Sequence, residues 1–113
     1  MPVTIYHNPR CSKSRQTLEL IRERGVEPEI VEYLDTPPTA DELKAILKKL
    51  GKRAAEIVRK KEAAEEGIDV ATLSEDALIA ALARHPRAIE RPIVIKGAKA
   101  ALGRPPESVL DIL

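Results

Sequence analysis

The chain has a single cysteine, Cys11, whose neighbours predict a reactive thiol. It follows a short apolar run and opens a helical pattern, so unpaired backbone N–H groups at the helix start would favour its thiolate. The thiolate is the nucleophilic form of cysteine. Arg10, Lys13 and Arg15 surround it, and no acidic residue occurs before Glu19. We therefore expect a lowered thiol pKa and chemistry centred on this residue.

Polar and basic neighbours of the cysteine are candidates for supporting roles. Ser14 stands where a C-x-x-C redox motif has its second cysteine, so any resolving thiol must come from another molecule. Its hydroxyl could donate to the thiolate, or it could be an ordinary polar residue of a first helical turn. His7 could lower the thiol pKa or relay a proton, or it could pack on the sheet edge. Arg15, about one helical turn beyond Cys11, could help to bind an anion.

Three arginines distant from the cysteine form a second candidate group. Arg91 precedes Pro92, Arg104 precedes a Pro-Pro pair, and Arg59 is expected at the end of a helical stretch. Arg91 and Arg104 flank the two strands of a predicted hairpin at ends that are neighbours in an antiparallel pair. If those ends face Cys11, two guanidiniums make a forked site for a tetrahedral oxyanion. Taken singly, each arginine would be interpreted as a surface charge.

The elements that must position these residues alternate between strand and helical patterns. The order is strand, helix, strand, then several helices, then two strands and a final helix. This order predicts an α/β fold: a thioredoxin-like βαβ…ββα sheet with a helical insertion. The expected strands are 3–6, 29–34, 92–95 and 98–102, and the expected helices are 12–24, 39–50 with a Thr39–Glu42 capping box, a short one near 54–58, 74–84 and one after 107.

Composition limits the classes of protein that the chain can belong to. Its 113 residues suit one domain, 1–113, and a net charge of +1 argues against a general nucleic-acid binder. Tyr6 and Tyr33 are the only aromatic residues, so no platform for base stacking is expected. No apolar run could span a membrane, and the start does not resemble a signal peptide. We expect a cytoplasmic monomer with no metal site and no bound cofactor, and a solvated mixed-charge surface at 60–66.

Several motifs resemble those of the glutaredoxin-coupled arsenate reductase family over essentially the whole chain. The similarity is strongest to a short branch with the signature Asn-Pro-Arg-Cys-Ser-Lys-Ser-Arg. The matching segments are Tyr6-His7-Asn8-Pro9-x-Cys11-x-x-Ser14-Arg15-x-Thr17-Leu18, Tyr33-Leu34-x-Thr36-Pro37, Arg91-Pro92-Ile93-Val94 and Arg104-Pro105.

The resemblance implies a thioredoxin-like fold with a helical insertion over about 36–87. It also implies that Cys11 is the nucleophile and that Arg59, Arg91 and Arg104 bind the oxyanion. The implied reaction is reduction of arsenate to arsenite, with glutathione as co-substrate and glutaredoxin as the partner that regenerates the cysteine. Pro92 is expected to open the third strand beside the thiol. The sequence leaves open whether the Arg91–Pro92 bond is cis.

Two other functions remain open at this point. Related thioredoxin-fold regulators bind RNA polymerase, but they typically carry the C-x-x-C switch that Ser14 removes here. A monothiol oxidoreductase or a binder of phosphate-like anions would use the same groups. The arginines do not distinguish arsenate from phosphate or sulfate in binding, although only arsenate is readily reduced by a thiol.

Overall fold

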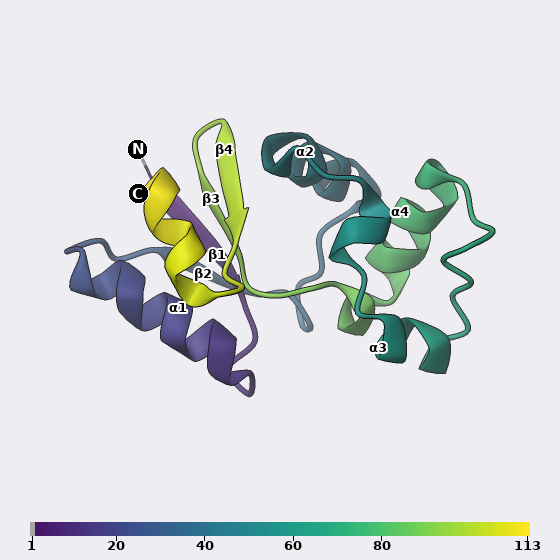
Figure 1. Ribbon diagram of the computed structural model, residues 1–113, viewed down its shortest axis with the longest axis horizontal. Coiled ribbons are helices and arrows are strands. Elements are labelled where there is room, and N and C mark those ends of the chain that lie inside the picture. Colours follow the sequence, from purple (N-terminus) through teal and green to yellow (C-terminus); the bar gives the residue numbers. More distant parts are fainter. Residues whose placement is uncertain (1) are drawn as a thin grey trace. The chain divides into compact units, whose positions relative to one another are not determined.

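The computed structural model describes residues 2–113, which form two compact units. The first unit combines the chain up to Thr36 with Arg91–Leu113, and the second is Pro37–Glu90. The first unit contains the four strands of a sheet, whereas the second is built from helices (Figure 1).

The first unit is organised around a sheet with the strand order β2-β1-β3-β4. β1 (Val3–His7) pairs in parallel with β2 (Glu29–Glu32) and antiparallel with β3 (Ile93–Lys96). β3 in turn pairs antiparallel with β4 (Lys99–Leu102) through a tight turn in which Gly97 has a φ of +61°. The predicted α/β, thioredoxin-like arrangement of strands is confirmed.

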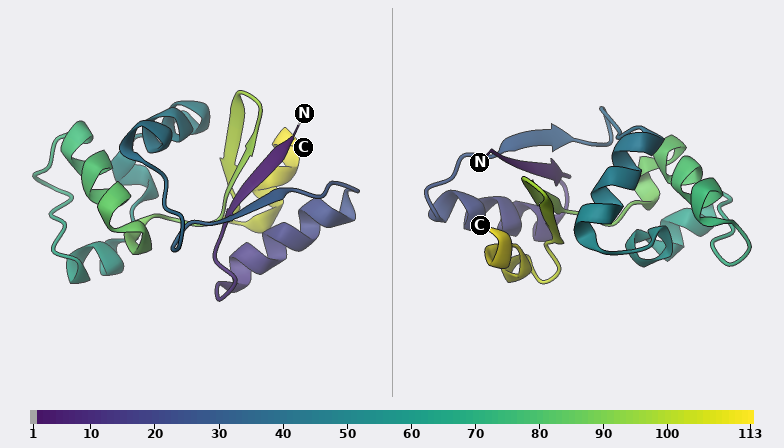
Figure 2. Two further views of the ribbon diagram at one scale, coloured as in Figure 1. Left: turned by 180° about the vertical axis from the view of Figure 1, so that it is seen from behind. Right: turned by 90° about the horizontal axis from the view of Figure 1, so that it is seen from above.

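Two helices of the first unit lie on the same face of this sheet (Figure 2). α1 (Ser12–Glu23) joins the parallel strands β1 and β2, and the 3₁₀ helix η3 (Pro106–Ile112) ends the chain. Apolar side chains at helical spacing on α1 meet the inward positions of the strands, which alternate along β1. The buried core consists of Val3, Ile5, Leu18, Ile21, Val94 and Val109.

β2 and the final helix differ from the predicted elements. β2 ends at Glu32 rather than at 34, because the backbone N–H groups of Asp35 and Thr36 both donate to the Glu32 carbonyl, at 2.9 and 3.0 Å. This turn leaves Leu34 exposed. The final helix is 3₁₀ rather than α, and its first turn is closed by a 3.0 Å bond from Ser108 N–H to the Pro105 carbonyl.

The second unit is a group of short helices in which α2 and α4 pack together. The predicted capping box of α2 is confirmed: Thr39 Oγ1 accepts from Glu42 N–H, and Glu42 accepts from Thr39 N–H at 2.9 Å. Ser74 caps α4, also as predicted. The elements are α2 (Ala40–Leu50), η1 (Ala54–Ile57), α3 (Lys60–Glu65), α4 (Glu75–Arg84) and η2 (Pro86–Ala88).

Gly103, directly after β4, allows the backbone to approach β3 and α1 closely. Its N–H donates to the Pro92 carbonyl at 3.0 Å. A Cβ atom at this position would lie 2.7 Å from Pro92 Cγ and still closer to Thr17 Oγ1. Glycine is therefore required here for space, since only the absence of a side chain lets these three segments meet.

We expect Gly103→Ala to lower the free energy of unfolding by about 1–3 kcal/mol, because the added methyl overpacks a buried contact. Urea denaturation followed by circular dichroism measures this loss. The matched background is Thr17→Ala, which removes one of the two crowding side chains. The cost of Gly103→Ala should be smaller in that background, and equal costs in both would contradict the steric explanation.

Candidate active site

Cys11 lies in a hydrogen-bonded loop between β1 and α1 and is the N-cap residue of α1. Its backbone N–H donates to the Asn8 carbonyl, and its own carbonyl accepts from Arg15 N–H, both at 3.0 Å. Asn8 Oδ1 accepts from Arg10 N–H, also at 3.0 Å. These bonds fix the backbone of the loop and leave the partly exposed thiol at the start of the helix.

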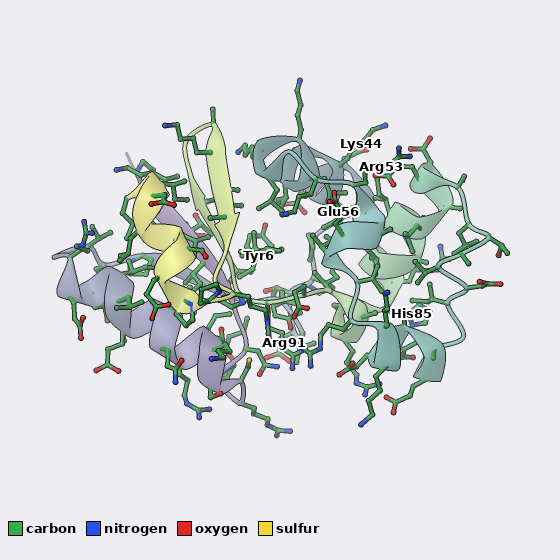
Figure 3. The ribbon with its side chains drawn as sticks, viewed as in Figure 1. Tyr6, Lys44, Arg53, Glu56, His85 and Arg91 are labelled. Carbon is green, nitrogen blue, oxygen red and sulfur yellow. The ribbon has the colours of Figure 1, made fainter. Side chains whose placement is uncertain are left out.

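Two arginines from the β3–β4 hairpin lie at this thiol. Arg104 Nη2 is 3.7 Å from Cys11 Sγ, and Arg104 Nε donates to the Arg91 carbonyl at 2.8 Å. The Arg91 side chain acts on the same thiol, because its hydrogen bonding and its charge both lower the pKa of Cys11. Arg91, which is labelled in Figure 3, lies two residues before the start of β3. The expectation that the two arginines meet across the antiparallel pair is confirmed, and their roles remain predictions.

The environment of the thiol favours its ionised form. Burial acts in the opposite direction and would raise the pKa of Cys11. Hydrogen bonds from the backbone N–H of Ser14, the Arg91 side chain and the backbone N–H of Lys13 outweigh burial, together with the Arg91 charge, and lower this pKa. A partly exposed cysteine with a lowered pKa is the arrangement expected of a reactive thiol.

Ser14 contributes its backbone N–H to the thiol, whereas its hydroxyl has other partners. The Ser14 Oγ lies 2.6 Å from His7 Nδ1 and accepts from Asn8 N–H at 3.0 Å. All three residues are buried. Of the two roles considered for Ser14, a hydroxyl bond to the thiolate is not the one observed, because the hydroxyl faces the end of β1. The hydroxyl instead ties the loop that carries Cys11 to the sheet.

His7 is the last residue of β1 and is buried beneath this loop. Burial lowers its pKa; the charges of Arg22 and Arg15 act in the same direction, and Glu32 opposes them. The neutral ring is consequently the favoured form near pH 7, so His7 does not supply the positive charge considered from the sequence. A neutral imidazole bonded to a serine hydroxyl can still take part in proton transfer.

The remaining predicted residues of the first unit support the loop and the strand beside it. Arg15 Nη1 donates to the Pro9 carbonyl at 2.9 Å, which braces the segment before Cys11. Pro92 is fully buried, and the Arg91–Pro92 bond is cis, as is Arg104–Pro105. Pro92 itself precedes β3, which starts one residue later than expected.

Arg59 belongs to the second unit and is held by two carboxylates. Its Nε lies 3.2 Å from Glu62 Oε2, and its Nη1 lies 3.0 Å from Glu90 Oε1. The expectation that Arg59 ends a helical stretch is wrong. Val58 and Arg59 are extended and pair with residues 88–89, so that Arg59 is the N-cap of α3 instead. The expectation that residues 60–66 form a solvated surface is also wrong at Glu62, whose side chain is only 17% exposed.

Three functional side chains were not singled out from the sequence. Asn8 organises the cysteine loop, and an Asn-Pro turn is a local signal that could have identified it. Glu62 and Glu90 hold Arg59, and the three-residue spacing between Arg59 and Glu62 is a local signal for the first of these pairs. Residue Glu90 is 31 positions from Arg59, so the contact depends on the folded second unit.

Residues 2–113 contain neither a metal-binding cluster nor a helix suited to crossing a membrane. Within residues 2–113, no group of three or more His, Cys, Asp or Glu residues is placed to hold a metal ion. None of the helices in the same part of the chain is long and apolar enough to cross a membrane.

Comparisons with known proteins identify close relatives of this fold and sequence. The ArsC family model matches residues 6–112. The chain is 54% identical to the uncharacterized protein YfgD of Escherichia coli strain K12, over 98% of this chain and 96% of that protein. It is 50% identical to an arsenate reductase of Neisseria meningitidis serogroup A, with coverage of 98% and 97%. A solved arsenate reductase from Vibrio cholerae is 47% identical with a TM-score of 0.94, covering 100% of this chain and 98% of that one.

Because the pKa of Cys11 is lowered, we expect its thiol to be alkylated rapidly at pH values below about 8.5, the usual pKa of a cysteine. The rate of reaction with iodoacetamide, followed by mass spectrometry, should rise at a lower pH because the thiolate persists there. Arg91→Gln should move the midpoint to higher pH. Arg24→Gln, an exposed charge at the other end of α1, is the matched control. An unshifted midpoint in Arg91→Gln would contradict the electrostatic assignment.

Ser14→Ala should lower the free energy of unfolding by about 1–3 kcal/mol, because His7 Nδ1 and Asn8 N–H lose a buried partner. Chemical denaturation measures the change. Ser12→Ala, an exposed serine in the first turn of the same helix, should change stability by less than about 0.5 kcal/mol. Similar losses in the two variants would show that the buried network is not the cause.

Proposed function

This chain belongs to the ArsC family, and we propose on that basis that it is an arsenate reductase with Cys11 as its nucleophile. The observation that carries the proposal is the meeting of two guanidiniums with one activated thiol. Arg104 Nη2 lies 3.7 Å from the sulfur, and the Arg91 guanidinium lowers the pKa of the same thiol. Planar, permanently charged donors suit a tetrahedral oxyanion, and the thiolate beside them suits attack on its central atom.

In the first proposed step, the Cys11 thiolate attacks the arsenic atom of bound arsenate. A sulfur–arsenic bond forms, and one arsenic oxygen leaves as hydroxide, which takes up a proton to become water. Arsenic remains As(V) in this adduct. Arg91 and Arg104 stabilise the negative charge on the oxygens, since donors fixed in advance are most effective where charge accumulates.

In the second proposed step, the thiolate of glutathione attacks the sulfur of the adduct. A disulfide forms between glutathione and Cys11, the sulfur–arsenic bond breaks, and its electron pair stays on arsenic. Arsenic is thereby reduced to As(III) and leaves as arsenite, while each sulfur is oxidised by one electron. Glutaredoxin then attacks the glutathione sulfur and releases the Cys11 thiolate.

An external thiol is a chemical requirement of this scheme. Cys11 is the only cysteine of the chain, so no intramolecular disulfide can complete the cycle. Glutathione as co-substrate and glutaredoxin as partner follow from the family resemblance. We propose that the chain works as a cytoplasmic monomer without a bound cofactor, because a glutathione-rich compartment supplies the reducing equivalents.

Other residues are proposed to assist the same reaction. Arg59 would be the third arginine to bind the oxyanion, a role that rests on the resemblance. His7 and Ser14 would hold the cysteine loop in place, and Arg15 would brace its first half. Pro92 would keep backbone close to the thiol at the start of β3.

The proposal predicts arsenate-dependent oxidation of NADPH when glutathione, glutaredoxin and glutathione reductase are supplied. Cys11→Ala should abolish turnover. Arg104→Gln should lower kcat/KM for arsenate by about 10²-fold, the size typical of losing one fixed donor to a developing oxyanion. Arg24→Gln is again the control and should leave kcat/KM close to the wild-type value.

Folded wild-type protein that shows no turnover with several glutaredoxins would overturn the arsenate assignment. If its thiol still has a lowered pKa, a monothiol oxidoreductase acting on another substrate becomes the better explanation.

A further inference from the structure

The guanidinium of Arg59 is occupied by two carboxylates of its own chain. Its Nε donates to Glu62 Oε2 at 3.2 Å, and its Nη1 donates to Glu90 Oε1 at 3.0 Å. The side chains of Arg59 and Glu90 are each 23% exposed, and that of Glu62 is 17% exposed. Water screens ion pairs of such low exposure only weakly, so they are stronger than ion pairs on the open surface.

The backbone fixes the positions of both carboxylates relative to the arginine. Arg59 N–H donates to the Ala88 carbonyl, and Glu90 N–H donates to the Ile57 carbonyl, both at 2.7 Å. These bonds flank the bridge between Val58 and Ile89, which holds the Arg59 and Glu90 segments side by side. Glu62 lies in the first turn of α3, three residues after Arg59. The ion pairs are therefore a built feature of the second unit.

In these two ion pairs, one guanidinium is shared by two carboxylates. Burial alone would lower the pKa of Arg59, but the hydrogen bonds and charges of Glu62 and Glu90 outweigh it and raise that pKa. A guanidinium binds an oxyanion best through two parallel N–H bonds from one side of its fork. In Arg59, Nε and Nη1 already donate to carboxylates. The negative charges of these carboxylates also repel an approaching anion.

We propose that Glu62 and Glu90 are internal competitors of the oxyanion for Arg59 and thereby set its affinity. This inference rests on the proposed role of Arg59 as an oxyanion ligand. When the anion binds, at least one carboxylate gives up its bond to the guanidinium. Glu62 and Glu90 are thus affinity-determining residues, although neither touches the reacting atoms.

The test replaces each carboxylate by its neutral isostere and measures binding of inorganic phosphate, a tetrahedral anion that a thiol does not reduce. Isothermal titration calorimetry of Glu62→Gln, Glu90→Gln and the double variant gives the Kd. We expect each single change to tighten phosphate binding by about 3- to 10-fold, because a competing charge is removed while the side-chain shape is kept. KM for arsenate should fall in parallel.

Glu65→Gln is the matched control for these variants. It removes the same charge from the same helix, but Glu65 pairs with Arg87 at 2.8 Å in an exposed ion pair. We expect its effect on the phosphate Kd to stay below about 2-fold. A second control is Arg59→Gln, in which Glu90→Gln should no longer change the Kd, since the two residues act through one contact.

Unchanged or weaker phosphate binding in both Glu62→Gln and Glu90→Gln would overturn the inference. So would an equal gain in Glu65→Gln, which would indicate a general charge effect, or a complete absence of phosphate binding in every variant. Failure of the proposed function has a different signature. In that case the two variants bind phosphate more tightly than wild type, as expected, while no form of the protein reduces arsenate.

Discussion

The arrangement around Cys11 depends on the close approach of backbone at Gly103. Because Gly103 has no side chain, its N–H reaches the Pro92 carbonyl, and the Thr17 side chain of α1 occupies the space that a Cβ at Gly103 would need. Arg91 precedes Pro92, and Arg104 follows Gly103, so this contact fixes the backbone that carries both guanidiniums. The helix that supplies Thr17 also has Cys11 at its start. One steric contact thus couples the hairpin to the helix and brings two charges to one thiol.

The electrostatics of the thiol follow from this packing. Burial by itself works against a thiolate, so the lowered pKa of Cys11 requires donors that are already in place. Ser14 shows how the loop achieves this: its backbone N–H faces the sulfur, while its hydroxyl binds His7 and Asn8. The same residue therefore stabilises the ionised thiol and anchors the loop, through two different groups.

The sequence predicts those features that depend on local pattern or on a general pairing rule. The strand at the start, the helix after Cys11 and the capping box at Thr39 are local patterns of this kind. The meeting of Arg91 and Arg104 follows from antiparallel pairing, once the hairpin is recognised. The partner of the Ser14 hydroxyl depends on the direction in which a helix start faces the sheet. The second carboxylate at Arg59 depends on where the fold brings Glu90, which is 31 residues away in the chain. Neither is encoded by spacing along the chain.

The arginines named by the family resemblance have different physical environments in this chain. Arg104 donates from Nε to a carbonyl, which orients the guanidinium while Nη2 faces the sulfur. An anion that binds there meets a donor already fixed in direction, which is the condition for effective stabilisation of charge. The Arg59 guanidinium is also held in one orientation, but its partners are two carboxylates, which would compete with a bound anion. Under the role proposed for Arg59, substitutions at Glu62 or Glu90 would change the affinity for an oxyanion through this one guanidinium.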